Sequence, residues 1–298
     1  MSGRAVFIRA PAKVNLGLEV LRKRRDGYHE IRTLFQSVSL TDGIRLERRR
    51  RGIRLECPGV DGRKEENLAW RAAELFLEKT GATGGMSVDV AKGIPVGGGL
   101  GGGSSDAAAV LLGACRLFGQ KPALEDLAGW AGELGSDVPF FVYGGAAVGT
   151  GRGERIETLR AKLPAGRVLI YAPPFSISTA EVYSAFRRRR LTGEDDRLTL
   201  LVKKRHKGSI ASLGKALFNH LERVVLERHP DLAEARRLLQ ESGAAGAQVS
   251  GSGSCLFGLY ASPGQALLAA ADLRKRLPGR LAVARFLPPR LRWGVVKR

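Results

Sequence analysis

A run of glycines near residue 100 constrains this chain more than any other part of its sequence. Residues 95–106 read Pro-Val-Gly-Gly-Gly-Leu-Gly-Gly-Gly-Ser-Ser-Asp, with six glycines in seven positions. Glycine exposes backbone N–H groups and lets a ligand approach the chain closely. The apolar run that follows predicts a helix through Leu117, capped by Ser104 or Ser105. Because the N-terminus of a helix attracts anions, we interpret the segment as a phosphate-binding loop.

The sequence context excludes the two commonest loops of this kind. No Gly-Lys-Ser/Thr follows the glycines, so the segment is not a Walker A loop. No strand–helix–strand unit surrounds it, so it is not a dinucleotide-binding fingerprint either. A flexible glycine linker is the alternative, but a linker would not lead directly into an apolar helix.

The composition is that of a globular protein with an excess of positive charge. The 298 residues suggest about two domains, and 44% of them are hydrophobic. The three cysteines are far apart and form no CxxC pair, which argues against disulfides and zinc and predicts a reducing compartment. The chain shows no apolar leader and no apolar run near the ~18 residues of a membrane span, so we expect a cytoplasmic protein. The net charge of +20 predicts anionic ligands, whether nucleic acid, lipid headgroups or phosphorylated metabolites.

The order of the predicted elements indicates an α+β fold. β-rich runs predict strands at Val6–Ile8, Val14–Val20, Thr33–Leu40, Ser87–Val90, Val168–Tyr171, Leu256–Tyr260 and Leu281–Phe286. Amphipathic runs, the first preceded by the capping residue Asn67, predict helices at Ala69–Lys79, Leu124–Leu134, Leu217–Glu227, Asp231–Glu241 and Gln265–Leu277. Strands and helices mix without a regular βαβ alternation, so we expect two α+β domains, residues 1–160 and 161–298.

Two further segments have local signals. The pair Gly144-Gly145 between short apolar runs predicts a hairpin of Phe140–Val142 and Ala146–Val148. Residues 187–209 hold two clusters of basic side chains, and we expect them to form an exposed insertion or a loose connection.

Polar side chains at two places are candidates for chemistry. Lys13 and Asn15 are two residues apart on a predicted strand, so they share a face that would suit a phosphorylated or hydroxylated ligand. Taken alone, a solvated strand face is the favoured interpretation of this pair. Asp137 comes just before an apolar run and could serve as a general base, although a helix-capping carboxylate is the commoner role.

Aromatic and small residues supply two more candidates. Tyr28 and His29 follow an Asp-Gly turn, with Phe35 downstream, and such rings could enclose a base. The alternative, favoured when the residues are taken alone, is a core tyrosine beside an exposed histidine. Residues 251–254 read Gly-Ser-Gly-Ser, which fits a tight turn and a second wall of the phosphate site equally well. The four histidines have no HxxxH or HExxH spacing, so we expect no structural metal.

Together these motifs resemble those of the galactokinase, homoserine kinase, mevalonate kinase and phosphomevalonate kinase (GHMP) superfamily. Within it, the chain is most similar to the family of 4-diphosphocytidyl-2-C-methyl-D-erythritol kinases. The triple-glycine loop and the Asp-Gly-Tyr-His string at 26–29 are the most specific matches. Matching segments follow the family's order at residues 11–16, 25–30, 33–36, 95–105, 135–141, 178–183, 219–222 and 250–255.

The resemblance implies a fold and a reaction. The fold would be α+β, with an N-terminal half like the second domain of ribosomal protein S5 and a ferredoxin-like C-terminal half. The reaction would transfer a phosphoryl group from ATP, with Mg²⁺, to the 2-hydroxyl of 4-diphosphocytidyl-2-C-methyl-D-erythritol, in the non-mevalonate pathway to isoprenoid precursors. Asp137 matches the residue that takes the hydroxyl proton, and Lys13 matches the one that holds it ionised and stabilises developing charge.

The resemblance also implies which residues bind the two substrates. Positions matched to contacts of the acceptor are Asn15, Tyr28, His29, Phe35, Thr179 and Tyr183. Positions matched to contacts of ATP are Asn67, Pro95, Val96, Gly97, Gly98, Gly99, Leu100, Gly101, Gly102, Gly103, Ser104 and Ser105.

Two other functions compete with this one. A homoserine or mevalonate-like acceptor would keep the superfamily, but such acceptors have no base for the Asp-Gly-Tyr-His string to enclose. A nucleic-acid-binding protein would use the +20 charge, but aromatic residues are only 6% and no RNA-binding signature occurs. We therefore expect a small-molecule substrate, no nucleic-acid or membrane partner, and a monomer or weak homodimer.

Overall fold

The structure is a computed structural model that describes residues 5–288 apart from 61, 160–162 and 187–196. The strands are β1 Val6–Lys23, β2 His29–Arg49, β3 Ile53–Glu56, β4 Gly85–Ala91, β5 Ala146–Thr150, β6 Arg155–Leu159, β7 Arg167–Ala172, β8 Phe218–Asn219, β9 Gly246–Val249, β10 Leu256–Tyr260 and β11 Arg280–Ala284. The helices are α1 Leu68–Thr80, α2 Gly102–Phe118, α3 Leu124–Leu134, α4 Val138–Tyr143, α5 Thr179–Ala185, α6 Arg197–Lys207, α7 Ile210–Ala216, α8 Glu222–Arg228, α9 Pro230–Glu241 and α10 Pro263–Leu273, with a 3₁₀ turn at Lys64–Glu66.

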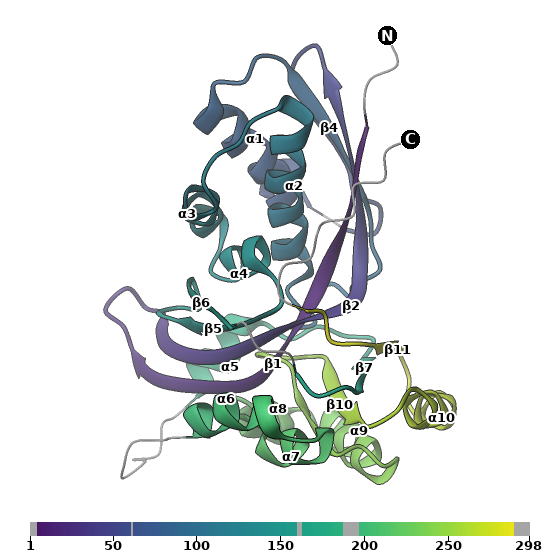
Figure 1. Ribbon diagram of the computed structural model, residues 1–298. Helices are drawn as coiled ribbons and strands as arrows, with labels where there is room; N and C mark the ends of the chain where they lie inside the picture. The colour runs from purple at the N-terminus through teal and green to yellow at the C-terminus, as the bar shows by residue number, and fades with distance from the viewer. Residues whose placement is uncertain (1–4, 61, 160–162, 187–196, 289–298) are drawn as a thin grey trace.

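The first sheet is organised around two long antiparallel strands. Its path is β3-β4-β2-β1-β8, and β5 pairs with β2 and with β6. The predicted strands Val6–Ile8 and Val14–Val20 are parts of one strand, β1, because register shifts after Pro11 and Asn15 keep it paired with β2 where the apolar alternation breaks. Figure 1 shows β1 and β2 running from the layer of α1 and α2 down toward the second sheet.

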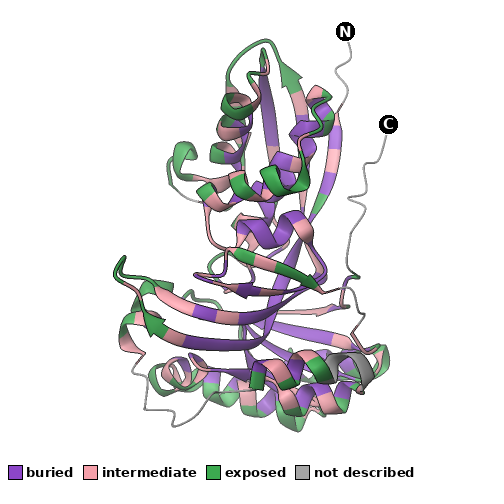
Figure 2. Ribbon diagram, turned by 60° about the vertical axis from the view of Figure 1, so that its left-hand side comes forward, coloured by how far each residue is buried: buried purple, intermediate pink, exposed green. Residues whose placement is uncertain are grey.

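The second sheet has the order β11-β7-β10-β9. One core cluster lies between the first sheet and α1–α4, and a second lies between the second sheet and α8–α10. A third cluster joins the two halves, since Val14 and Leu34 of the first sheet pack with Ile170 and Phe257 of the second. Figure 2 shows the buried residues following these strands and the inner faces of the helices. The expected α+β class is confirmed.

Most predicted elements agree with the structure to within a few residues. Asn67 caps α1, and Gly81 ends it in a left-handed conformation, as expected. The predicted helix at Leu124–Leu134 coincides with α3. The last helix is shorter than predicted and ends at Leu273, because residues 274–279 form turns before β11.

The predicted hairpin at Phe140–Val142 is wrong. Residues 138–143 form the short helix α4, with Pro139 in its first turn and Gly144 ending it at a φ of 65°. Proline is favoured in a first helical turn, where its missing N–H is not needed. The apolar run is buried in the core against α2, so its hydrophobicity does not indicate a strand. The other half of the prediction holds, because Ala146–Thr150 is β5.

The serines do not cap α2. Gly101, at a φ of 71°, is the N-cap, and Ser104 and Ser105 lie inside the first turn. The glycine run reaches left-handed conformations at no steric cost, so the helix begins three residues earlier than a cap at Ser104 would allow.

Two predictions in the second half also need correction. Residues 187–196 lie outside the described part of the chain, but 197–207 form α6, whose Leu198 and Leu201 are buried, so this part is not a loose insertion. The predicted helix Leu217–Glu227 is wrong at its start, because Phe218–Asn219 pairs with β1 as β8. Gly17 makes room for this packing: a Cβ there would lie 2.7 Å from Leu201 and 2.8 Å from Phe218.

The expected domain boundary near residue 160 stays a prediction. Within the described ranges, no helix is long and apolar enough to cross a membrane.

Candidate active site

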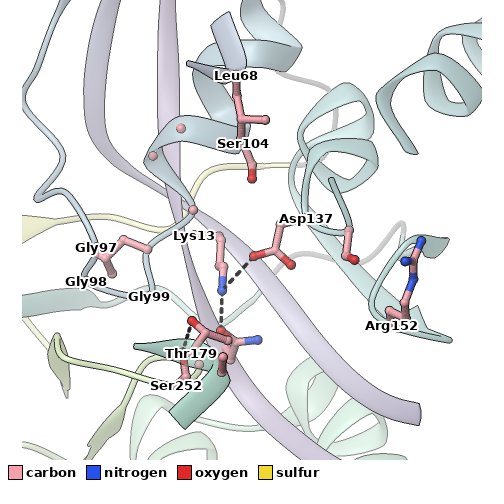
Figure 3. A pocket seen from close by; sticks show the side chains of 18 of the residues that line it. Lys13, Leu68, Gly97, Gly98, Gly99, Ser104, Asp137, Arg152, Thr179 and Ser252 are labelled. Carbon is pink, nitrogen blue, oxygen red and sulfur yellow. Dashed lines mark hydrogen bonds and ion pairs between the residues drawn. The ribbon is translucent and has the colours of Figure 1, made fainter. Parts of the chain in front are cut away.

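A single pocket of about 1040 Å³ brings the sequence motifs together. Its walls come from the glycine-rich loop, the middle of β1, the start of β2, the residues before α4, the start of α5 and the turn at 250–254. These segments are far apart in sequence. Figure 3 shows Lys13 and Asp137 between the glycine loop on one side and Arg152 on the other.

The glycine loop passes so close to other backbone that side chains would not fit. Gly97, Gly99 and Gly101 all have φ near 70°. A Cβ on Gly98 would lie 2.3 Å from Cys255 Sγ, and one on Gly99 would lie 2.2 Å from the Ser250 carbonyl oxygen. Backbone conformation therefore favours glycine at 97, 99 and 101, and the lack of space requires it at 98 and 99.

The loop is held from both sides by hydrogen bonds. The backbone N–H of Lys13 donates to the Leu100 carbonyl at 2.9 Å, and the Cys255 N–H donates to the Gly98 carbonyl at 3.1 Å. The Ser250 hydroxyl donates to the Gly99 carbonyl at 3.1 Å. The segment 251–254 therefore forms a turn against the loop, and Gly251 and Ser252 line the same pocket.

The start of α2 faces the same pocket. The helix is 17 residues long and opens directly from the loop, so its N-terminal dipole favours an anion at this wall. The side chain of Ser104 points from its first turn toward Asp137 (Figure 3). Ser105, by contrast, is fully buried beneath the loop. Asn67 lines the far end of the pocket and accepts a hydrogen bond from the Ala69 N–H, which fixes its side chain.

Lys13 and Asp137 form the ionic centre of the pocket. The Lys13 ammonium lies 3.3 Å from Asp137 Oδ2 and donates to Asn15 Oδ1 at 2.7 Å. The Asn15 amide in turn donates to Thr33 Oγ1 at 2.8 Å. Lys13 is only 4% exposed, so a network of fixed groups orients it. Lys13 and Asn15 share a face as predicted, and that face is buried rather than solvated.

Asp137 is not a capping carboxylate. It stands at the N-cap position of α4, but its side chain accepts no capping hydrogen bond. It turns toward Lys13 instead, and its side chain is 32% exposed. A carboxylate that is paired and still accessible from the pocket can receive a proton from a bound hydroxyl.

Three of the predicted aromatic residues line the pocket, and two of them are in contact. The rings of His29 and Tyr183 lie 5.2 Å apart between centroids, although the residues are on β2 and α5. Tyr28 is 56% exposed and lines the pocket beside them. Burial, and then the nearby charge of Lys23, lowers the pKa of His29, which favours the neutral imidazole. Burial, and then Asp137, raises the pKa of Tyr183, so its hydroxyl stays protonated.

Phe35 occupies a different environment. It is 1% exposed, and its ring packs against Phe140 at 4.9 Å between centroids. The Lys13 ammonium lies 5.3 Å from the same ring. Phe35 therefore lines the pocket from the core, beneath Lys13, whereas Tyr28 lines it from an exposed position.

Thr179 completes this wall from the first turn of α5. Its hydroxyl lies 2.8 Å from that of Ser252, so α5 is tied to the turn at 250–254. Both residues line the pocket.

Sequence reasoning missed a buried ionic network behind the loop. Lys92 Nζ donates to Asp42 at 2.5 Å and to Asp106 at 2.8 Å. Asp42 also accepts from the N–H groups of Gly93 and Ile94, at 2.6 and 2.8 Å, so it anchors the segment between β4 and the loop. About fifty residues separate Asp42 from Lys92, so sequence spacing could not reveal the pair.

This network predicts a pH dependence of stability. Burial, aided by Asp42 and opposed by Lys92, raises the pKa of Asp106 from 3.8 to about 7. The folded state then binds more protons than the unfolded state between about pH 4 and 7, so Asp106 makes folding less favourable as the pH rises through that window. We therefore compare the unfolding free energies of wild type and Asp106→Asn. The value for wild type minus that for the variant should fall by up to about 4 kcal/mol between pH 4 and 7. Urea titrations at pH 4.5 and 7.5 measure the difference, and equal values at both would contradict the shift.

The fold and this site are those of a class of small-molecule kinase, with a glycine-rich loop, a lysine–aspartate pair and a group of aromatic residues around one cavity. Residues 67–145 match the GHMP kinases N terminal domain, and residues 200–279 match the GHMP kinases C terminal domain. The 4-diphosphocytidyl-2-C-methyl-D-erythritol kinase of Pelotomaculum thermopropionicum is 43% identical over 95% of this chain and 98% of its own. That of Geobacter metallireducens is 42% identical over 91% of this chain and 94% of its own.

Solved structures support the same family and fold. A crystal structure of 4-(cytidine 5'-diphospho)-2C-methyl-D-erythritol kinase is 38% identical, has a TM-score of 0.81 and matches 94% of this chain and 98% of its own. Homoserine kinase from Cytophaga hutchinsonii, at 20% identity, has a TM-score of 0.77 over 99% of this chain and 98% of its own, and shows the shared fold. The chain belongs to the GHMP kinases and, within them, to the 4-diphosphocytidyl-2-C-methyl-D-erythritol kinase family.

Proposed function

We propose that this protein transfers the γ-phosphoryl group of ATP to the 2-hydroxyl of 4-diphosphocytidyl-2-C-methyl-D-erythritol, a step toward isoprenoid precursors. One observation carries the proposal. The Lys13–Asp137 pair stands in one pocket between a phosphate loop and a group of aromatic residues on the opposite side. A phosphoryl donor at the loop and a base-bearing acceptor at the rings would then meet at the pair.

In the proposed reaction, Asp137 accepts the proton of the 2-hydroxyl as its oxygen bonds to the γ-phosphorus. The bond from that phosphorus to the β–γ bridging oxygen breaks, and ADP leaves. Lys13, held by Asn15, places a positive charge where negative charge gathers on the transferring group. Little of the catalysis has to be covalent, because phosphoryl transfer depends mainly on positioning and charge.

ATP would bind along Pro95–Ser105, with its phosphates on the backbone N–H groups at the start of α2. Its adenine would point to the end where Asn67 lies.

Mg²⁺ fits this arrangement as an ion that arrives with ATP. Within the described residues, no group of three or more His, Cys, Asp or Glu could hold a metal. Mg²⁺ commonly keeps several waters and binds through substrate phosphates with few protein ligands, and the Ser104 hydroxyl is an oxygen donor at that wall. The ion would offset charge on the phosphates.

On the acceptor side, we propose that Tyr28 and Tyr183 stack on the cytosine and that His29 reads its edge. Stacking on a ring is worth about 1–3 kcal/mol per base and tolerates any base, so discrimination needs hydrogen bonds. Asn15 and Thr179 would contact the rest of the acceptor, and Phe35 would act from behind Lys13. A monomer or weak homodimer in the cytoplasm remains part of the proposal.

The test is the choice of acceptor. ADP release should be efficient with the cytidine-diphosphate polyol and weak with a uridine analogue, homoserine or mevalonate. His29→Ala is expected to lower kcat/KM for the cytidine substrate by roughly 10-fold or more, because a buried polar group left unpaired costs about 1–3 kcal/mol. The variant should also have a smaller ratio of kcat/KM for the cytidine substrate to kcat/KM for the uridine analogue. Its Kd for ATP should be unchanged. Equal use of both analogues by the wild type, or efficient phosphorylation of homoserine, would defeat the assignment.

A further inference from the structure

Arg152 lies in the pocket, and none of the motifs described above includes it. It occupies the turn between β5 and β6 and lines the acceptor side, across Lys13 and Asp137 from the glycine loop (Figure 3). The turn is fixed in place: the Ile31 N–H donates to the Gly151 carbonyl at 2.7 Å, and the Arg152 N–H donates to Glu154 at 2.6 Å. The position of Arg152 is therefore set by its backbone.

The turn lies between the two ends of the proposed acceptor site. A Cβ placed on Gly153 would lie 3.7 Å from Asp137 Oδ1, where the reacting hydroxyl would sit. In the other direction, the Arg152 guanidinium lies 5.0 Å from the ring centre of Tyr28, where the base would sit. In a cytidine-diphosphate polyol, the diphosphate is the group that joins these two ends.

The charges of the pocket leave this guanidinium available. Two of the four cationic side chains that line the pocket are engaged by carboxylates, Lys13 by Asp137 and Lys92 by Asp42 and Asp106. Among the described residues, no carboxylate pairs with the guanidinium of Arg152, and the nearby Asp26 is held by Arg24. Lys23 is exposed, and its charge acts on His29, which places it at the base end.

We propose that Arg152 binds the diphosphate of the acceptor and selects acceptors that carry one, an inference that rests on the proposed function. Its planar fork of N–H donors matches two phosphate oxygens at once, which an ammonium cannot do. The guanidinium lies over the exposed ring of Tyr28 in a cation–π contact, which orients it and leaves its N–H donors free for a phosphate.

Steady-state kinetics with three variants test the role. Arg152→Ala is expected to raise the KM for the cytidine-diphosphate polyol roughly 10- to 100-fold, the range for loss of charge-assisted hydrogen bonds. The kcat should change less than about threefold, and the KM for ATP should stay the same, because the reacting groups are intact. The KM of Arg152→Lys for the cytidine-diphosphate polyol should lie between those of wild type and Arg152→Ala. Arg155→Ala, an exposed arginine three residues along that does not line the pocket, is the matched control and should equal wild type.

A binding experiment isolates the diphosphate. Calorimetry with the ATP site filled by a non-hydrolysable ATP analogue compares CDP with cytidine in wild type and in Arg152→Ala. In Arg152→Ala, the affinity for CDP should fall by the same factor as the KM rises. The affinity for cytidine should fall by less than about twofold. Unchanged CDP affinity in Arg152→Ala overturns the inference even if the wild type phosphorylates the proposed acceptor. An equal loss for cytidine also overturns it, because Arg152 would then act by supporting the Tyr28 ring.

Two further outcomes separate this inference from the proposed function. If Lys23→Ala weakens CDP binding and Arg152→Ala does not, Arg152 does not bind the diphosphate. The inference is then wrong, while the proposed function stands. If wild type neither binds CDP nor uses the cytidine-diphosphate polyol, both fail together.

Discussion

Asp137→Asn is expected to lower kcat roughly 10²- to 10⁴-fold, while the Kd for ATP stays within about twofold of wild type. An amide has nearly the shape of the carboxylate, but it cannot accept the proton of the acceptor hydroxyl. The substitution also removes the ionic partner of Lys13, which lies 3.3 Å away. The lower end of the range applies if the transition state is loose, because the hydroxyl then needs little deprotonation before transfer.

Single-turnover kinetics and nucleotide binding measure the two quantities separately. Asp126→Asn, which makes the same change at an exposed position on α3, should match wild type in both. A variant that keeps wild-type turnover would show that Asp137 is not the proton acceptor.

Gly99→Ala is expected to disrupt the glycine-rich loop, although it adds only one methyl group. The new Cβ would lie 2.2 Å from the Ser250 carbonyl oxygen and 2.9 Å from that of Gly253, at a φ of 73° that alanine rarely adopts. Both neighbours are backbone, so the loop has to move. We expect the KM for ATP to rise at least 10²-fold, or the unfolding free energy to fall by roughly 1–3 kcal/mol, because overpacking costs about that much.

Gly103→Ala provides the control for this prediction within the same run of glycines. Its added Cβ would meet only Leu68, at 3.8 Å, and the residue is already helical. This variant should be as stable as wild type or slightly more so, since alanine favours a helix over glycine, and it serves as the control for the loss of stability. If both variants behaved alike, the close packing of Gly99 against the turn at 250–254 would be refuted.

Much of the site could be predicted from the sequence because its parts are local. Asn67 before an amphipathic run predicts a capped helix from neighbouring residues alone, and α1 begins where expected. The glycine run likewise predicts a loop at a helix start, since both properties depend on adjacent residues. Errors arose where long-range burial decides the structure. The run at 138–143 is apolar enough for a strand but forms α4, because the core against α2 accepts it as a helix.

The sequence by itself determined the glycine loop at a helix start, the shared face of Lys13 and Asn15 on one strand, and the family to which the chain belongs. Each depends on residue types at fixed spacing, which the backbone geometry of a strand or helix start turns directly into positions. Only the tertiary structure showed that Asp137 is a paired carboxylate and not a helix cap, since its partner, Lys13, lies on β1, far away in the sequence. It also decided that Phe35 lies in the core, and that Asp42, Lys92 and Asp106 share a buried network. These pairings join residues tens of positions apart, and only the packing of two sheets and their helices brings such residues within contact distance.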